Sequence, residues 1–219
     1  MAQILTQEQI ITLRTLATTE LASRFYFSGG TALSYYYLHH RFSEDLDFFS
    51  VSEVDLQSII VTLRSVQEKL HYASYDVQNS FNRNLFFLKF DNGSILKLEF
   101  TYYPFIQVEP PKFRGGLLVD SVLDIAVNKL FTIFQKARGR DYYDMYCILQ
   151  KYNYTLERLR MLAKQKFDWD VDPLQLASKL YQVDQYTDDP ILVKTLNRDQ
   201  LISFFQREAL NLDKEILDR

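Results

Sequence analysis

The stretch FSGGTALSYYYLHHRFSEDLDFF, residues 27–49, contains two adjacent glycines, a helical apolar pattern and two closely spaced carboxylates. The aromatic run before the glycines is short and typical of a strand, and residues 31–40 carry apolar side chains at helical intervals. Residues 45–49 alternate acidic and apolar side chains, which predicts a second strand. The segment is therefore expected to form a strand, a glycine turn, a helix and another strand.

Asp45 and Asp47 are two residues apart, so they project from the same face of the expected strand, while Leu46 and Phe48 point the other way. Two like charges held side by side are unfavourable unless a cation lies between them, and Mg2+ prefers oxygen ligands of this kind. The alternative is that Asp45 caps a turn and Asp47 is a solvated strand residue, which the D-x-D pattern alone does not exclude.

The glycines at the start of the expected helix are typical of phosphate-binding turns. Glycine lets the backbone approach a ligand closely, and the N–H groups of a first helical turn favour an anion. The alternative is a tight turn in which Ser28 or Thr31 is the helix N-cap. Arg41 suits either a phosphate contact or a surface ion pair, and Ser43 suits a phosphate contact or a bond that orients the acidic loop. The candidate phosphate-binding residues are Ser28, Gly29, Gly30, Thr31, Arg41 and Ser43.

A hairpin is predicted over residues 86–100, where apolar and polar side chains alternate on both sides of an Asn-Gly turn. Glu99 lies between two apolar neighbours in the second strand, so it is expected to project away from the main core, as Asp45 and Asp47 do. Three carboxylates on neighbouring strands would suit two divalent ions about 4 Å apart, an arrangement that serves phosphoryl or nucleotidyl transfer. A lone glutamate on a half-exposed strand is about as often simply solvated.

The organisation of the chain predicts an α+β fold in two parts, 1–119 and 120–219. The first part is expected to be a mixed sheet flanked by helices, with a last short strand at 116–119, and the second part a helical C-terminal half. Apolar residues at helical spacing indicate helices over 4–22, 54–70, 121–136, 141–151, 156–166, 173–181 and 198–217. Thr6 and Gln9 are spaced as a capping box for the first of these helices.

Lys129 lies on the apolar face of the predicted helix 121–136, where an unpaired ammonium group would be costly. It needs an anion, either a nucleotide phosphate or a carboxylate such as Asp141. The alternative is a lysine whose aliphatic stem packs while its charged head reaches water. Asp141 and Asp144 share a face at the start of the next helix, and capping would explain Asp141 but not Asp144.

Composition excludes several classes of protein. The 219 residues are 47% hydrophobic and 24% charged, which is typical of a globular protein. The net charge of −3 gives no global reason to bind nucleic acid, so an RNA contact would need a local basic surface. The single cysteine excludes an internal disulfide and a cysteine zinc site. Neither a secretion signal nor a run of 18 apolar residues is apparent, so no membrane contact and a cytoplasmic location are expected. The candidate basic surface is Lys136, Arg138, Arg140, Arg158, Arg160, Lys164 and Lys166, although exposed charged helix faces are common.

The glycine turn and the acidic strand together resemble the nucleotidyltransferases of the DNA polymerase beta superfamily, and more narrowly the AbiEii/AbiGii toxin family. That family has a G-G-T-x-L turn followed by an H-R-x-S-x-D-x-D strand. The matching residues are Gly29, Gly30, Thr31, Leu33, His40, Arg41, Ser43, Asp45 and Asp47. A second family pattern, D-x-x-x-x-K followed by a basic segment and [KR]-D-x-x-D-[LM], is matched by Asp124, Lys129, Arg138, Arg140, Asp141, Asp144 and Met145. The resemblance extends to about residue 150.

The resemblance implies a polymerase-beta-like core that transfers a nucleotide from a nucleoside triphosphate (NTP), with Mg2+ or Mn2+ as cofactor. Asp45, Asp47 and Glu99 would hold two metal ions, and Glu99 would also help to deprotonate the acceptor hydroxyl.

The second motif implies that the helical half completes the active site. Lys129 would neutralise charge on the phosphates, and Asp141 would position Lys129 or the acceptor. Asp144 and Arg138 would support them.

The family setting implies the toxin of a bacterial toxin–antitoxin or phage-defence system, with tRNA or another RNA as acceptor and an antitoxin protein as partner. One alternative is a non-catalytic nucleotide-binding or antitoxin-like module. Another is an enzyme that adds AMP to a protein. A pure binding module would not require three metal-binding carboxylates, so we favour an enzyme.

Overall fold

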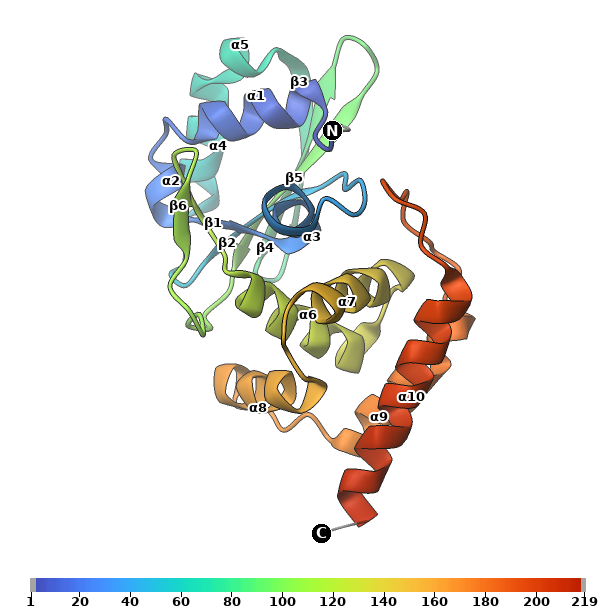
Figure 1. The fold of residues 1–219 in the computed structure, drawn as a ribbon. Coiled ribbons are helices and arrows are strands. Elements are labelled where there is room, and N and C mark those ends of the chain that lie inside the picture. Colours follow the sequence, from blue (N-terminus) through green and yellow to red (C-terminus); the bar gives the residue numbers. More distant parts are fainter. Residues whose placement is uncertain (1–2, 218–219) are drawn as a thin grey trace. The chain divides into compact units, whose positions relative to one another are not determined.

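A computed structural model describes residues 3–217 of the chain, which divide into two compact units, Met1–Ser121 and Val122–Arg219. Figure 1 shows the ribbon of both units. No helix within residues 3–217 is long and apolar enough to cross a membrane.

The first unit is built on a mixed seven-stranded sheet with the order β3-β4-β5-β2-β1-β7-β6. β2 lies near the middle of the sheet, antiparallel to β1 and parallel to β5, and β1 is also parallel to β7. The strands are β1 (Tyr26–Ser28), β2 (Leu46–Ser50), β3 (Tyr72–Ser80), β4 (Arg83–Phe90), β5 (Ile95–Tyr102), β6 (Lys112–Arg114) and β7 (Leu117–Val119). Parallel and antiparallel pairing in one sheet confirms the predicted α+β class.

Local polar bonds define the start of the first helix and the break that follows it. The predicted capping box of Thr6 and Gln9 is present at the start of the first helix. The single helix predicted over 4–22 is two helices, because the hydroxyls of Thr18 and Thr19 donate to preceding carbonyls and compete with helix continuation. The helix predicted over 54–70 is likewise two. The helices are α1 (Gln7–Leu16), α2 (Leu21–Arg24), α3 (Gly29–Leu33), the π-helix η1 (Ser34–Leu38), α4 (Leu56–Ser65) and α5 (Gln67–Leu70).

A row of phenylalanines forms the core on one face of the sheet. Phe27, Phe48 and Phe100 come from β1, β2 and β5, and each is at most 2% exposed. The rings of Phe48 and Phe100 are stacked with centroids 5.2 Å apart, and those of Phe27 and Phe48 are 5.3 Å apart. Because side chains alternate along a strand, burial of these rings directs the intervening acidic residues to the opposite face.

The sheet ends in a hairpin of which only one strand was expected. β7 agrees with the short strand predicted at 116–119, but β6 was not predicted. Gly115 and Gly116 join the two strands with positive φ values of 57° and 87°. β6 is short and mostly exposed, so it has no alternating apolar pattern to reveal it.

The second unit is helical, as predicted. Its helices are α6 (Val122–Lys136), α7 (Gly139–Lys151), α8 (Leu156–Phe167), α9 (Pro173–Tyr181), the 3-10 helix η2 (Gln182–Gln185) and α10 (Arg198–Leu217). The start of α7 precedes the predicted residue 141. The N-cap residue Arg138 makes no side-chain cap bond, and Asp188 instead accepts a hydrogen bond from the Gly139 N–H at 2.7 Å. A carboxylate far along the chain therefore caps α7, which no local pattern reveals.

Candidate active site

The acidic residues of β2 and β5 lie on one face of two paired strands. Asp47 is directly opposite Glu99 in the parallel register, and Ser28 of β1 is opposite Asp47 on its other side. Leu46 and Phe48 are buried on the reverse face. The expected juxtaposition of acidic strands is confirmed, although Glu99 is only 6% exposed and is not a solvated strand residue.

The glycine turn lies directly against this acidic strand. Gly29 has a φ of +73°, and a Cβ atom placed on it would lie 2.1 Å from Oδ2 of Asp47. A Cβ on Gly30 would lie 2.2 Å from Nη2 of Arg41 and 3.2 Å from Oγ of Ser43. The two glycines are therefore required for close approach, and the turn gathers three other predicted site residues around it.

The hydroxyl groups that flank the glycines are engaged within the protein. Ser28, 1% exposed, donates to Oδ2 of Asp120 at 2.8 Å. Thr31, fully buried, donates to the backbone carbonyl of Asp45. Ser28 occupies the N-cap position of α3 but makes no side-chain cap bond. These two side chains brace the turn and the acidic loop. Any phosphate contact at the turn would fall to its backbone.

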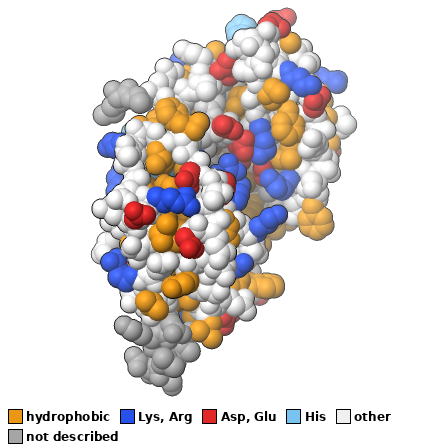
Figure 2. Space-filling model, turned by 90° about the vertical axis from the view of Figure 1, so that its right-hand side faces the viewer, with side chains coloured by type: hydrophobic (Ala, Val, Ile, Leu, Met, Phe, Trp, Pro, Cys, Tyr) orange, Lys and Arg blue, Asp and Glu red, His pale blue; other side chains and the backbone are white. Residues whose placement is uncertain are grey.

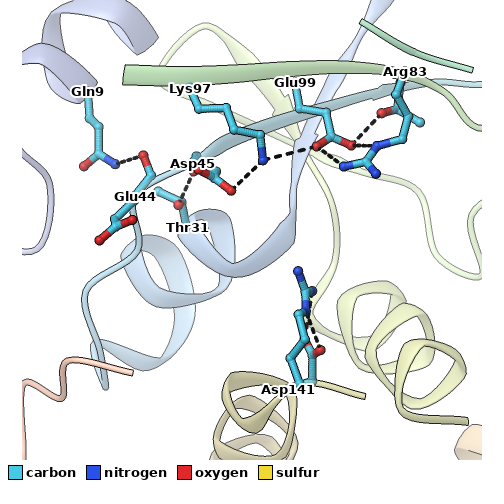
Figure 3. A network of polar contacts seen from close by, with 10 residues as sticks. Gln9, Thr31, Glu44, Asp45, Arg83, Lys97, Glu99 and Asp141 are labelled. Atoms are coloured by element: carbon cyan, nitrogen blue, oxygen red, sulfur yellow. Dashed lines mark hydrogen bonds and ion pairs between the residues drawn. The ribbon is translucent and has the colours of Figure 1, made fainter. Parts of the chain in front are cut away.

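Two cations of the protein lie among the carboxylates (Figure 3). Nζ of Lys97 is 2.8 Å from Oδ2 of Asp45 and 3.6 Å from Oε2 of Glu99. Arg83 donates from Nε and Nη2 to the two oxygens of Glu99 at 2.7 and 2.6 Å, and Thr101 donates to Oε1 of Glu99 at 2.9 Å. Glu99 is thus the acceptor for a two-point guanidinium contact and for a hydroxyl group.

The charge of Glu99 is stabilised by these contacts. Burial raises its pKa, but the hydrogen bond and charge of Arg83, together with Thr101 and Lys97, lower it more, so the pKa lies below its usual value. The pKa of Arg83 is raised, first by its hydrogen bond to Glu99 and with further contributions from the charges of Asp47 and Asp45. The carboxylate of Glu99 is therefore ionised at neutral pH.

The donor set suits a hard divalent cation. Carboxylate oxygens are the ligands that Mg2+ and Mn2+ prefer, and the absence of a side chain on Gly29 lets the carboxylate of Asp47 lie against the turn. Among the side chains that the structure describes, within residues 3–212, no three of Asp, Glu, His or Cys are arranged around one point as ligands of a metal ion. Two of the three carboxylates contact Lys97 instead. The residues therefore fit a metal ion by chemistry and strand position, with a protein cation among them.

The residues predicted for this site did not include Lys97, Arg83 or Gln9. Lys97 precedes Glu99 by two positions in one strand, so the alternation that identified Glu99 could have identified Lys97. Arg83 reaches Glu99 from β4, and only the register of the hairpin reveals that. Gln9 donates from its amide to the carbonyls of Ser43 and Glu44 at 2.8 and 3.0 Å. Gln9 is more than 30 residues from the acidic loop in sequence, so the only local pattern that it forms is the capping box.

The second unit contains a buried charge cluster. Lys129 lies 2.7 Å from Asp141 and 2.6 Å from Asp144, and neither carboxylate side chain is exposed. The carboxylate partner predicted for Lys129 is confirmed, and the alternative of a head group in water is wrong. Arg138 also contacts Asp141, from Nε to Oδ2 at 3.0 Å. Burial raises the pKa of Asp141, but the charges of Lys129 and Arg138 outweigh it and hold the pKa below its usual value.

A second buried ion pair in this unit corrects the predicted basic surface. Lys166 contacts Asp124 at 2.7 Å, and both side chains are fully buried. Lys166 is therefore a core residue and does not belong to a basic surface. The prediction was wrong because an amphipathic pattern does not show whether a lysine ammonium group has a buried partner. Lys136, Arg158 and Lys164 are exposed, as expected. On the face drawn in Figure 2, Lys and Arg side chains are interspersed with Asp and Glu, so that face has no broad basic field.

Most of the chain matches the model of one protein family. Residues 11–215 match the model of the family described as "Nucleotidyl transferase AbiEii toxin, Type IV TA system". The chain belongs to this AbiEii family. It is a nucleotidyltransferase, and the family is that of a toxin–antitoxin system. The nine positions of the glycine turn and acidic strand, which first suggested the resemblance, lie within the matched residues.

Individual proteins are similar to the chain in sequence or in fold. Protein aq_aa25 of Aquifex aeolicus (strain VF5) is 31% identical over 165 residues, which is 74% of this chain and 76% of the relative. Among solved structures, JHP933 from Helicobacter pylori has a TM-score of 0.64 at 20% identity, covering 97% of this chain and 91% of its own. A second solved Helicobacter pylori protein has a TM-score of 0.65 at 19% identity and covers 98% of both chains. These two likenesses show the shared fold.

Proposed function

We propose that this AbiEii nucleotidyltransferase transfers a nucleotide from an NTP to a hydroxyl group of RNA, such as tRNA. The observation that supports the reaction centre is the position of Asp47, which is opposite Glu99 and against Gly29. Asp45, Asp47 and Glu99 would hold Mg2+ or Mn2+, which when bound would stabilise charge on the reacting phosphate. Attack on the α-phosphate would release pyrophosphate.

The surroundings of each residue indicate the role that it would have in the reaction. The backbone of Gly29 and Gly30 would bind the triphosphate, because glycine has no side chain of its own to hold a ligand away from the backbone. Arg41 and Ser43, packed against Gly30, would hold the turn and the acidic loop in place. The lowered pKa of Glu99 favours a fixed negative charge over a proton acceptor, since an efficient general base needs a pKa closer to the working pH.

The second motif has a proposed role of its own. Lys129 would neutralise phosphate charge, while Asp141 and Asp144 would hold its ammonium group in position, with Arg138 supporting Asp141. The observed contacts fix Lys129 within the second unit, and its action on the nucleotide stays a prediction.

The biological setting follows from the family. We infer that the chain is the toxin of a toxin–antitoxin or phage-defence system and that an antitoxin protein is its partner. Exposed cations such as Lys136, Arg158 and Lys164 would contact the RNA backbone. Because an NTP donor and a tRNA acceptor both occur in the cytoplasm, we expect the protein to act there.

Transfer of label tests this proposal. Purified protein would be incubated with each α-labelled NTP, Mg2+, and either total tRNA or a protein extract. We expect label in tRNA and a loss of more than about 100-fold in Asp45→Asn, because the variant removes a charge from the reaction centre. Asp76→Asn is the matched control, because Asp76 is 62% exposed and pairs with Lys89 on the β3–β4 hairpin.

The acceptor distinguishes the alternatives. Label in protein would identify an AMP-transferase. Absence of transfer to any acceptor, with Asp45→Asn behaving as wild type in cells, would favour a non-catalytic nucleotide-binding or antitoxin-like module.

A further inference from the structure

The position of Lys97 is fixed by the strands that carry the carboxylates. Leu46 of β2 is opposite Leu98 of β5 in the parallel register, so Asp45 and Lys97, which directly precede them, are neighbours. Lys97 also shares its side of β5 with Glu99, two positions later. Backbone pairing therefore places an ammonium group beside two of the three carboxylates.

The contacts of Lys97 differ in kind from those of Arg83. Arg83 contacts Glu99 at two points, through a rigid planar group. Lys97 makes one short contact, 2.8 Å from Oδ2 of Asp45, with Glu99 further away at 3.6 Å. Its side chain is 24% exposed, so the flexible stem has access to solvent. Of these two cations, Lys97 is the one that can leave without breaking a two-point contact.

We propose that Lys97 is an internal counter-ion that competes with the divalent metal ion for Asp45. In the metal-free protein its ammonium group neutralises the repulsion between Asp45 and Glu99 and keeps the acidic face assembled. Entry of a divalent ion moves Nζ away from Oδ2 of Asp45, which becomes available to the ion. The proposal deepens the metal site described under Proposed function and rests on it.

Electrostatics gives the direction of the effect. A positive charge beside the ligand oxygens opposes the binding of a second cation, and salt screens part of this repulsion. Removal of the Lys97 charge should therefore tighten metal binding. A lysine that merely oriented Asp45 for the metal would have the opposite effect, because its removal would loosen a ligand.

Direct metal binding tests the proposal without any activity assay. Mn2+ binding would be measured by electron paramagnetic resonance for wild type, Lys97→Met, Asp45→Asn and Lys89→Met. Lys97→Met keeps the length of the side chain and removes its charge. Lys89→Met removes the same charge from the exposed Lys89–Asp76 pair and controls for net charge. We expect Lys97→Met to bind Mn2+ at least about tenfold more tightly than wild type, and Lys89→Met to bind as wild type.

Each outcome separates Lys97 from the metal site itself. Unchanged or weaker binding in Lys97→Met, with binding lost in Asp45→Asn, would overturn the role of Lys97 and leave the metal site standing. Absence of site-specific binding in every variant, or wild-type binding in Asp45→Asn, would overturn the metal site and the proposal with it.

A measurement on wild type covers the case in which Lys97→Met does not fold. Acetylation of Lys97 by acetic anhydride would be followed by mass spectrometry with and without Mg2+, with Lys89 as the internal reference. We expect Mg2+ to raise the labelling rate of Lys97 severalfold and leave that of Lys89 unchanged. Equal labelling of Lys97 in both conditions would show that the ammonium group does not leave, and would overturn the proposal.

Discussion

Asp47 faces Glu99 across two parallel strands, and that register is set by packing on the reverse side of the sheet. Phe48 and Phe100, the next residues of the two strands, are also opposite each other, and their rings stack at an interplanar angle of 15°. A slip of one residue would bury the carboxylates and expose the rings. The hydrophobic core thus determines which charges meet, and the glycine turn determines what approaches them.

The contact between Gly29 and Asp47 predicts the effect of a single methyl group. Gly29→Ala would place Cβ 2.1 Å from Oδ2 of Asp47, so the carboxylate or the turn must move. A displacement of about 1 Å in a reaction centre costs roughly 100-fold in rate, and we expect that loss in nucleotidyl transfer. Steady-state transfer of labelled nucleotide measures it.

Gly93 provides the matched control for Gly29. It has a similar φ of +82°, but a Cβ placed on it would meet nothing within 4 Å. Both alanine variants should lose about 1–2 kcal/mol of stability from the left-handed conformation, and only Gly29→Ala should lose activity. Equal activity in the two variants would contradict a close approach of functional importance.

Gln9 links a helix cap to the acidic loop, and the two roles can be separated. Gln9→Glu keeps the oxygen that accepts from the Thr6 N–H, but it replaces the amide that donates to the carbonyls of Ser43 and Glu44. At this position, which is 1% exposed, the carboxylate would face two carbonyl oxygens with no donor between them, so the loop should shift and transfer should fall about tenfold or more. Hydrogen exchange over residues 42–46 and the rate of transfer measure both effects.

Thr6→Ala is the control for Gln9→Glu, because it removes the other half of the capping box. It should cost about 1 kcal/mol of helix stability and leave the rate of transfer unchanged. Loss of activity in Thr6→Ala, or wild-type exchange of the acidic loop in Gln9→Glu, would show that Gln9 does not position the loop.

Local patterns predicted the backbone better than the partners of the charges. Alternation identified β2 and β5, and glycine spacing identified the turn, because these signals lie within a few residues of one another. The breaks within 4–22 and 54–70 were missed because the apolar spacing continues through them, and in the first case threonine hydroxyls compete with the helix. β6 was missed because an exposed edge strand has no buried face to alternate.

Charge partners depend on register and tertiary packing, which no short window contains. Lys129 was correctly expected to need an anion, but Asp141 and Asp144 together satisfy it. Lys166 looked like a solvated cation, yet it is buried against Asp124. Of the cations of the acidic face, Lys97 shares its side of β5 with Glu99 by alternation, whereas the contact of Arg83 depends on the pairing of β4 with β5. The signs of the charges were readable from the sequence, whereas their partners were not.

The lowered pKa of Glu99 predicts how Arg83 affects stability as pH changes. A carboxyl whose pKa is lower in the folded state contributes stability above its unfolded pKa, and that contribution is lost as pH falls through the folded pKa. In Arg83→Met, burial remains and the main cause of the lowering is gone. The variant should therefore be less stable than wild type near pH 7, and the difference should narrow below about pH 4.5 as Glu99 protonates in both proteins.

Urea unfolding at several pH values between 3 and 7 measures this difference in stability, with hydrogen exchange of the β4 and β5 amides as the signal. Lys89→Met is the control, because its partner Asp76 is exposed and a surface pair contributes little. A gap between wild type and Arg83→Met that stayed constant with pH would mean that Arg83 stabilises the sheet by packing and not by charge.

The buried cluster of the second unit predicts a large loss of stability when its cation is removed. Lys129→Met leaves Asp141 and Asp144 buried without their common counter-ion, and breaking a buried pair costs about 3–5 kcal/mol. The single tryptophan, Trp169, lies in this unit, so its fluorescence during urea unfolding follows the unit separately.

Lys164→Met is the matched control, since Lys164 is 63% exposed and pairs with an exposed Asp170, and it should change stability by less than about 1 kcal/mol. Adding Asp144→Asn to Lys129→Met should restore part of the loss, because one of the two buried charges that Lys129 neutralised is then removed. A Lys129→Met variant as stable as Lys164→Met would mean that the carboxylates protonate or reach water without Lys129, and that the cluster does not hold α6 and α7 together.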